Sequence, residues 1–243
     1  IREILDRWNY LVGLEERKAE VIRIIEEQGK LTAELAEKIK KATKLQEVED
    51  LYRPFKQKRR TKASIAKERG LEPLAQWMLL LPEEGNLEEE AKKFINEESE
   101  VLNVEDAING AKDIIAEFVS DQAEVRKWIR SETMKNGIIQ SAVKDAEKDE
   151  KRVYEIYYDY QEPVSKIVPH RILAVNRGEK DEVLKVSIHP DADKILSYLE
   201  RMFAPKGNPE IRREVLSAVE DGYKRLIQPS IEREIRNELT EKA

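Results

Sequence analysis

The chain has no cysteine and very little histidine among its 243 residues. Disulfide bonds and cysteine-ligated zinc are therefore excluded. The two histidines, His170 and His189, lie outside any acidic or nucleophilic pattern that marks a metal site or a catalytic triad. No glycine-rich phosphate-binding loop is present. We therefore expect no enzyme, no cofactor and no metal, and an independent hydrolase is the weakest interpretation.

Long hydrophobic runs are also missing. No segment approaches the ~20 consecutive apolar residues that span a bilayer, and no charged stretch leads into the apolar core of a signal peptide. We therefore expect a cytoplasmic protein with no membrane partner. Because the chain begins at Ile1 and not at methionine, we also expect it to be part of something longer.

Charged residues make up 39% of the chain and apolar residues 40%, and only nine residues are glycine. This composition is typical of exposed amphipathic helices. The formal net charge is −6, which argues against indiscriminate binding to phosphate. A local basic patch can still bind nucleic acid, so the distribution of charge matters more than its sum.

Hydrophobic spacing predicts a mainly α fold, an irregular multi-helix domain with a small two-stranded β element. The first helix covers residues 1–28 and ends at Gly29, Thr32 and Thr43 cap the next two helices, and Trp8 and Ile114 belong to the core. The β element pairs two apolar segments. The two strands are residues 138–143 and 183–188. Two subdomains are expected, residues 1–136 and 137–243, and the first of them contains a basic loop at residues 53–62.

The basic loop is the strongest chemical feature. Arg53-Pro54 disfavours helix, and a dense run of cations follows. The candidate phosphate-binding residues are Lys56, Lys58, Arg59, Arg60, Lys62 and Lys67. Their side chains can neutralise several backbone phosphates in a salt-dependent way, without reading base sequence. The alternative is that these cations pair with the many carboxylates of the chain and hold helices together.

A cluster of four tyrosines offers a second candidate interface. Tyr154, Tyr157 and Tyr158 have the spacing of a helix face, and Tyr160 follows. Aromatic side chains can stack on nucleic-acid bases. Aromatics at helical spacing more often belong to a core, and we favour that interpretation.

Four segments of the chain, which together span nearly its whole length, resemble a known family; one of them is the helix that runs into residue 240. The segment LYRPFKQKRRTKASIAKERGLEPL (51–74) is similar to the signature stretch of the Tex family of bacterial transcription accessory proteins. EEQGKLTAELAEKI (26–39) and EPVSKIVPHRILAVNRGEKDEVL (162–184) resemble the same family, within its N-terminal helical region. Asn176 departs from the apolar or aromatic residue expected there, which affects local packing only.

The resemblance implies a role in transcription and nucleic-acid transactions, and it carries no catalytic residue. In the family this helical region precedes an RNase-H-like domain, helix-hairpin-helix elements and an OB-fold RNA-binding domain, and other helices precede it. Two functions remain open. The chain is a nucleic-acid-associated module, binding RNA or DNA through the basic loop, or it is a scaffold that packs against the remaining domains of its parent protein or against the transcription machinery.

Overall fold

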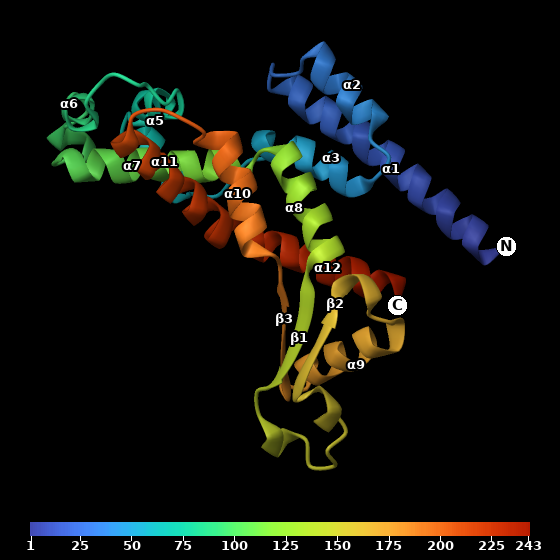
Figure 1. The fold of residues 1–243 in the computed structure, drawn as a ribbon. Coiled ribbons are helices and arrows are strands. Elements are labelled where there is room, and N and C mark those ends of the chain that lie inside the picture. Colours follow the sequence, from blue (N-terminus) through green and yellow to red (C-terminus); the bar gives the residue numbers. More distant parts are fainter. The chain divides into compact units, whose positions relative to one another are not determined.

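The computed structural model describes all 243 residues and is mainly helical, with one small antiparallel sheet (Figure 1). The predicted fold class is therefore confirmed. The chain forms two compact units, of which unit 1 comprises residues 1–61 and 121–127, and unit 2 comprises residues 62–120 and 128–243. This division differs from the boundary near residue 136 that the sequence suggests. None of the helices is long and apolar enough to cross a bilayer.

Unit 1 is built from three helices and a short 3-10 turn, and the first residues of α8 belong to it as well. The elements are α1 (Arg2–Glu27), α2 (Ala33–Lys41), α3 (Leu45–Tyr52), η1 (Arg53–Phe55) and α8 (Ala123–Asn136). Gly29, at a φ of +71°, ends the first helical segment in the left-handed conformation that glycine tolerates best. The Thr32 side chain then accepts a hydrogen bond from the Leu35 N–H and caps α2.

The start of α3 corrects the predicted cap. The residue at the N-cap position is Lys44, which makes no side-chain cap hydrogen bond, and Thr43 lies outside the helix. The Leu45 N–H instead donates to the hydroxyl of Tyr10 on α1, at 2.9 Å. The hydroxyl of Tyr10, on another helix, therefore accepts a hydrogen bond from the backbone at the start of α3, where the sequence predicted a cap by the neighbouring Thr43.

The core of unit 1 is a small apolar cluster between the three helices. Its buried members are Leu14, Val21, Ile25, Ile39, Ala42 and Val48. Trp8 is not among them, since 63% of its surface is exposed. The prediction that Trp8 is a core residue is therefore wrong. The periodic pattern of α1 predicted the helix correctly, but it did not predict which apolar residues are covered.

Unit 2 holds the other helices and the sheet. Its helices are α4 (Lys62–Glu68), α5 (Glu72–Leu79), α6 (Leu87–Lys92), η2 (Glu97–Ser99), α7 (Val104–Ser120), η3 (Ala146–Lys148), η4 (Glu155–Tyr157), η5 (Val164–Lys166), α9 (Pro169–Lys180), α10 (Ala192–Phe203), α11 (Pro209–Gly222), η6 (Tyr223–Ile227) and α12 (Gln228–Lys242). The strands are β1 (Ile138–Val143), β2 (Asp159–Pro163) and β3 (Leu184–His189).

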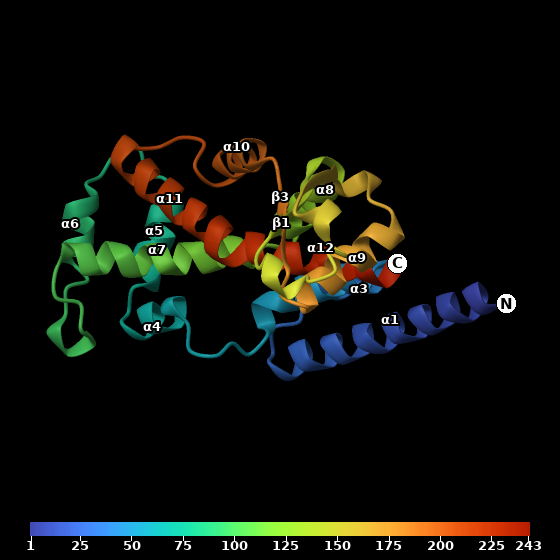
Figure 2. The ribbon, with the colours of Figure 1, turned by 90° about the horizontal axis from the view of Figure 1, so that it is seen from below.

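α7 lies at the centre of one half of unit 2, where α4, α5, α6 and α11 pack against it (Figures 1 and 2). Ile114 on α7 is only 6% exposed, as predicted for a core residue. α11 approaches α7 closely at Gly222, where an added Cβ would lie 2.7 Å from the Ala116 carbonyl oxygen. The missing side chain of this glycine therefore lets the two backbones touch.

α11 continues into α12 through η6, a five-residue π-helical turn. Pro229 lies at the start of α12, where a missing N–H is tolerated. The turn buries Tyr223, whose hydroxyl finds no hydrogen-bond partner. Burial raises the pKa of Tyr223 to about 12, because the phenolate would lose its hydration.

The sheet has the strand order β2-β1-β3, with both pairs antiparallel. The predicted pairing of residues 138–143 with the strand near 183–188 is confirmed, and Ile139 lies opposite Ile188. β2 is an addition, because its sequence, DYQEP, is polar and ends in proline. Ile139, Val186 and Ile188 are buried, and the residues between them along the strands are more exposed.

The two outer edges of the sheet are closed in different ways. At β3, Glu232 of α12 accepts a hydrogen bond from the Ile188 N–H at 2.9 Å, and Arg236 approaches the Val186 carbonyl. At β2, Pro163 has no N–H to donate and Asp159 adds a charge. Charge and proline are common on edge strands that do not pair further.

Candidate nucleic-acid interface

The basic loop begins at a fixed point of unit 1. Arg53-Pro54 forms the 3-10 turn η1 in place of further α-helix. The Gln28 side chain donates a hydrogen bond to the Phe55 carbonyl at 2.9 Å, and the Phe55 side chain packs against the core of unit 1. The chain therefore leaves the core at Lys56 from a defined position, and residues 57–59 have no helix or strand.

Asp121, in the segment that returns to unit 1, binds the loop. Its carboxylate pairs with the Lys58 ammonium and lies 3.7 Å from the Arg53 Nε. The Asp121 side chain is only 13% exposed, and that of Lys58 only 27%. Lys58 thus forms the internal salt bridge that the scaffold interpretation expects.

Lys56, Arg59 and Arg60 are all exposed. Lys56 and Arg59 make no ion pair and no side-chain hydrogen bond in the structure. Arg59 is not buried against a carboxylate, an arrangement that would have favoured a purely structural role. The loop therefore contains one cation that is tied down, Lys58, and two that are exposed and unpaired, Lys56 and Arg59.

The last two candidate residues belong to unit 2. Lys62 and Lys67 are both exposed on α4. Burial raises the pKa of Asp113 on α7, and the positive charge of Lys62 offsets part of this effect. Lys67 has no ion-pair partner. The structure therefore brings Lys56, Lys58 and the two arginines together in unit 1, with Lys62 and Lys67 in the other unit.

The charge of the chain is divided unequally between the units. Counting Lys and Arg against Asp and Glu, unit 1 has a formal net charge of +3 and unit 2 of −9, which together make the −6 of the chain. The basic loop therefore belongs to a positively charged body within an acidic protein. A local basic body of this kind is the electrostatic requirement for binding phosphate.

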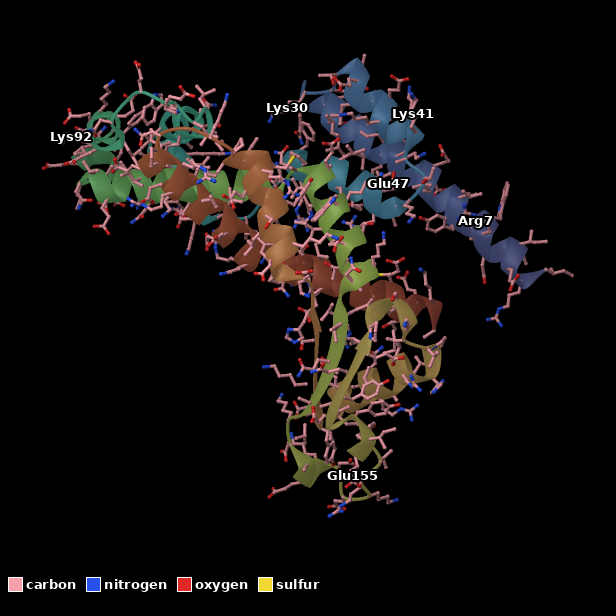
Figure 3. All side chains as sticks on the ribbon, viewed as in Figure 1. Arg7, Lys30, Lys41, Glu47, Lys92 and Glu155 are labelled. Carbon is pink, nitrogen blue, oxygen red and sulfur yellow. The ribbon has the colours of Figure 1, made fainter.

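The tyrosine cluster is part of a packed network at the far end of the sheet, which Glu155 marks in Figure 3. Tyr154 and Tyr157 are buried. Asp149 accepts hydrogen bonds from the Val153 and Tyr154 N–H groups and from the Tyr158 hydroxyl. These rings are therefore not available as a stacking platform, in agreement with the core interpretation. The expected helix face is a short 3-10 turn, η4.

Asp149 is ionised in this network. Burial pushes the pKa of Asp149 upward, but the hydrogen bonds from Tyr154, Tyr158 and Val153 outweigh that effect and leave the pKa below its usual value. On the neighbouring side, the Tyr154 hydroxyl donates to Asp181 at 2.6 Å. The loop between β1 and β2 is therefore held by hydrogen bonds to two carboxylates in addition to the buried rings of Tyr154 and Tyr157.

The sequence did not reveal the most deeply buried charges. In unit 1, Arg126 on α8 is fully buried and lies 3.8 Å from Asp50 on α3, which is also buried. Arg17 forms a two-point ion pair with Glu49, at 2.6 and 3.2 Å, and lies over the Tyr52 ring. The hydrogen bond to Glu49 raises the pKa of Arg17 further. No spacing of residues in the sequence predicts ion pairs between helices that are so far apart along the chain.

Comparison with known proteins places the chain in a family. A family profile described as Tex central region-like matches residues 83–243. The uncharacterized protein YdcI of Bacillus subtilis (strain 168) is 57% identical over 244 residues, which cover all of this chain and 34% of that protein. The chain thus spans about a third of the length of this relative.

Two further relatives have informative names. The transcriptional accessory protein Tex of Neisseria gonorrhoeae is 38% identical over 202 residues, covering 82% of this chain and 26% of that protein. The human S1 RNA-binding domain-containing protein 1 is 27% identical over 258 residues, covering all of this chain and 25% of that protein. In each case the similarity extends over only part of a longer protein.

Proposed function

Since the chain belongs to the Tex family, whose central-region profile matches residues 83–243, we propose that it is a nucleic-acid-associated module of a transcription accessory protein. Lys56 and Arg59 contact the phosphate backbone, and Arg60 adds to the positive field. Lys58 holds the loop to Asp121, so that Lys56 and Arg59 start from a fixed position. The names of the relatives, which refer to transcription and to RNA binding, agree with this role.

The observation that carries the proposal is the division within the loop. A loop that served only to hold helices together would pair all its cations, and Lys56 and Arg59 are exposed and unpaired. A contact made by such side chains positions the protein on nucleic acid and reads no base sequence. We therefore expect similar affinity for single-stranded RNA and DNA duplex of unrelated sequences, with a strong dependence on salt.

The test is fluorescence anisotropy with labelled single-stranded RNA and duplex DNA, at about 50 and 200 mM salt. The variant is Lys56→Ala/Arg59→Ala. Its matched control is Arg201→Ala/Lys206→Ala, which removes the same charge from two exposed residues of unit 2 that form no ion pair. We expect the loop variant to bind at least about tenfold more weakly and its salt slope to fall by about 2, with the control unchanged.

A structural scaffold is the second candidate, and the pairing of Lys58 and Arg53 with Asp121 favours it. In that case the wild-type chain would bind neither nucleic acid at the lower salt concentration. Equal losses in the loop variant and in the control would also count against the loop, because they would show that total charge and not position determines binding.

A further inference from the structure

The turn between α1 and α2 holds a cation, Lys30, at a fixed backbone position. The Gly29 N–H donates to the Glu26 carbonyl at 2.9 Å. The Lys30 N–H donates to the Ile25 carbonyl at 3.2 Å. With Gly29 in the left-handed conformation, these two bonds form the Schellman motif that ends many helices. The backbone of Lys30 is therefore held by the end of α1.

The side chain of Lys30 has no partner in the protein. Its position in a Schellman motif commonly carries an apolar residue that packs against the last turn of the helix. Here the next residue, Leu31, packs against the core of unit 1, and Lys30 is exposed and makes no ion pair. Figure 3 labels Lys30 at this turn. Its ammonium group is therefore available to an anion from outside the chain.

Gln28 links this turn to the basic loop. Its side-chain amide donates a hydrogen bond to the Phe55 carbonyl at 2.9 Å. The next residue of the loop, Lys56, is itself held by its N–H, which donates to the Arg53 carbonyl at 3.3 Å. Lys30 therefore follows one end of the Gln28 bond by two residues, and Lys56 follows the other end by one. With about 3.8 Å between successive α-carbons and the length of the glutamine side chain, the α-carbons of the two lysines lie within roughly 20 Å of each other.

We propose that Lys30 is a further phosphate-contact residue of the nucleic-acid site, and that Gln28 positions the basic loop beside it. This inference rests on the proposed function of Lys56 and Arg59, and it extends the site from one loop to two segments of unit 1. All three side chains are exposed and unpaired, so each can neutralise a backbone phosphate. Contacts from two segments fix the path of a strand over unit 1 without reading its bases.

The alternative role of Lys30 is structural. A cation near the end of a helix interacts favourably with the partial negative charge of the last carbonyl groups, and the last turn of α1 contains no basic residue. Glu26 and Glu27 add negative charge at that end, although Glu27 is paired with Arg23. A purely structural role predicts that removal of Lys30 lowers the thermal stability and leaves binding to nucleic acid unchanged. The effect on binding therefore distinguishes the two roles.

The first experiment compares Lys30→Ala with Lys44→Ala by fluorescence anisotropy, with single-stranded RNA and duplex DNA at about 50 and 200 mM salt. Lys44 is also an exposed, unpaired cation of unit 1. It adjoins Leu45, whose N–H binds Tyr10, and Tyr10 lies about 27 Å from Gln28 along α1. We expect Lys30→Ala to bind about three- to tenfold more weakly at the lower salt concentration, with a salt slope lower by about 1. Lys44→Ala should bind like the wild type.

The outcomes separate Lys30 from the loop site on which its role depends. If Lys30→Ala binds like the wild type while Lys56→Ala/Arg59→Ala binds more weakly, the loop site stands and Lys30 lies outside it. Equal losses in Lys30→Ala and Lys44→Ala would also overturn the role of Lys30, since the total charge of unit 1 would then determine binding. A wild-type chain that binds neither nucleic acid overturns both the loop site and its extension.

The second experiment tests Gln28 as a positioning residue. Gln28→Ala removes the bond to the Phe55 carbonyl and leaves every cation in place, so we expect the affinity to fall about threefold while the salt slope stays that of the wild type. Trypsin should also cut faster after Lys56, because the start of the loop opens more often. The matched control is Gln76→Ala, which removes an exposed amide without a hydrogen bond on α5. Unchanged affinity and unchanged cleavage in Gln28→Ala would contradict the positioning role.

The third experiment locates the bound strand directly, and the absence of native cysteine makes the labelling specific. A benzophenone maleimide attached to Lys30→Cys, Lys56→Cys or Lys44→Cys places a photoreactive group at a single position of each variant. Upon irradiation with labelled single-stranded RNA, we expect cross-linked product from positions 30 and 56 and little from position 44. Cross-linking from position 56 without cross-linking from position 30 would overturn the proposal, as would equal yields from positions 30 and 44.

Discussion

In unit 1, six buried apolar residues form the core, and ionised side chains are buried close to them. In unit 2, α7, α11 and the sheet bury a much longer series of aliphatic side chains, and most ion pairs lie at the surface. Unit 1 thus resembles a small domain in which the apolar core alone supplies little stability. Its stability depends on a few charges, whereas that of unit 2 depends on packing.

The largest effect should come from Asp50→Ala, which removes the buried carboxylate that lies 3.8 Å from the Arg126 guanidinium. Removing one partner of a buried ion pair costs about 3–5 kcal/mol. Urea unfolding followed by circular dichroism measures the loss. Glu200→Ala, which breaks the half-exposed pair with Arg212 in unit 2, should cost at most about 1 kcal/mol. Similar losses in the two variants would mean that the units do not differ in this way.

Apolar truncation should show the opposite pattern. Ile114→Ala in unit 2 removes a buried side chain and should lower the free energy of unfolding by about 2–5 kcal/mol. Trp8→Ala in unit 1, although it removes a larger side chain, should change the stability of the monomer by less than about 1 kcal/mol, since Trp8 is exposed. Thermal unfolding at low protein concentration avoids any contribution from association.

Alkaline pH should distinguish the core of unit 2 through Tyr223. Its pKa in the folded protein is about 12 and its ordinary value is 10.0, so the folded state favours the neutral phenol. This contribution is complete below pH 10 and is lost between pH 10 and 12. Between pH 9 and pH 11 the free energy of unfolding of the wild type should therefore fall by about 1 kcal/mol more than that of Tyr223→Phe. An unchanged difference between the two pH values would show that the hydroxyl reaches water.

The smallest effects are expected in the basic loop. Lys56→Ala/Arg59→Ala should change the stability of unit 1 by less than about 0.5 kcal/mol, because neither side chain has a partner. Lys58→Ala should cost up to about 1 kcal/mol through the lost pair with Asp121. Equal values for the two variants in chemical unfolding would contradict the division of the loop into anchored and free cations.

Local patterns in the sequence predicted most of the helices and the pairing of β1 with β3. They worked where the signal is local, as at Gly29 and Thr32. They failed where the decisive partner is distant along the chain. The Tyr10 hydroxyl accepts the hydrogen bond of the Leu45 N–H at the start of α3. The exposure of Trp8 likewise depends on which other helices reach it.

The same distinction applies to the candidate site. The run of cations is visible in the sequence, and its assignment to an exposed loop agrees with the structure at Lys56 and Arg59. The pairing of Lys58 with Asp121 was not predictable from the sequence, because the chain leaves unit 1 after residue 61 and returns to it only at Asp121. Whether the loop binds nucleic acid stays a prediction.

The closed edges of the sheet have a consequence for the behaviour of the protein at high concentration. A strand that ends in free N–H and C=O groups is a template on which a second molecule can grow a fibril. Here Glu232 occupies the N–H of Ile188, and Pro163 has none to offer. Any self-association of this chain should therefore remain soluble and reversible, with no gain of β structure, even after long incubation at high concentration.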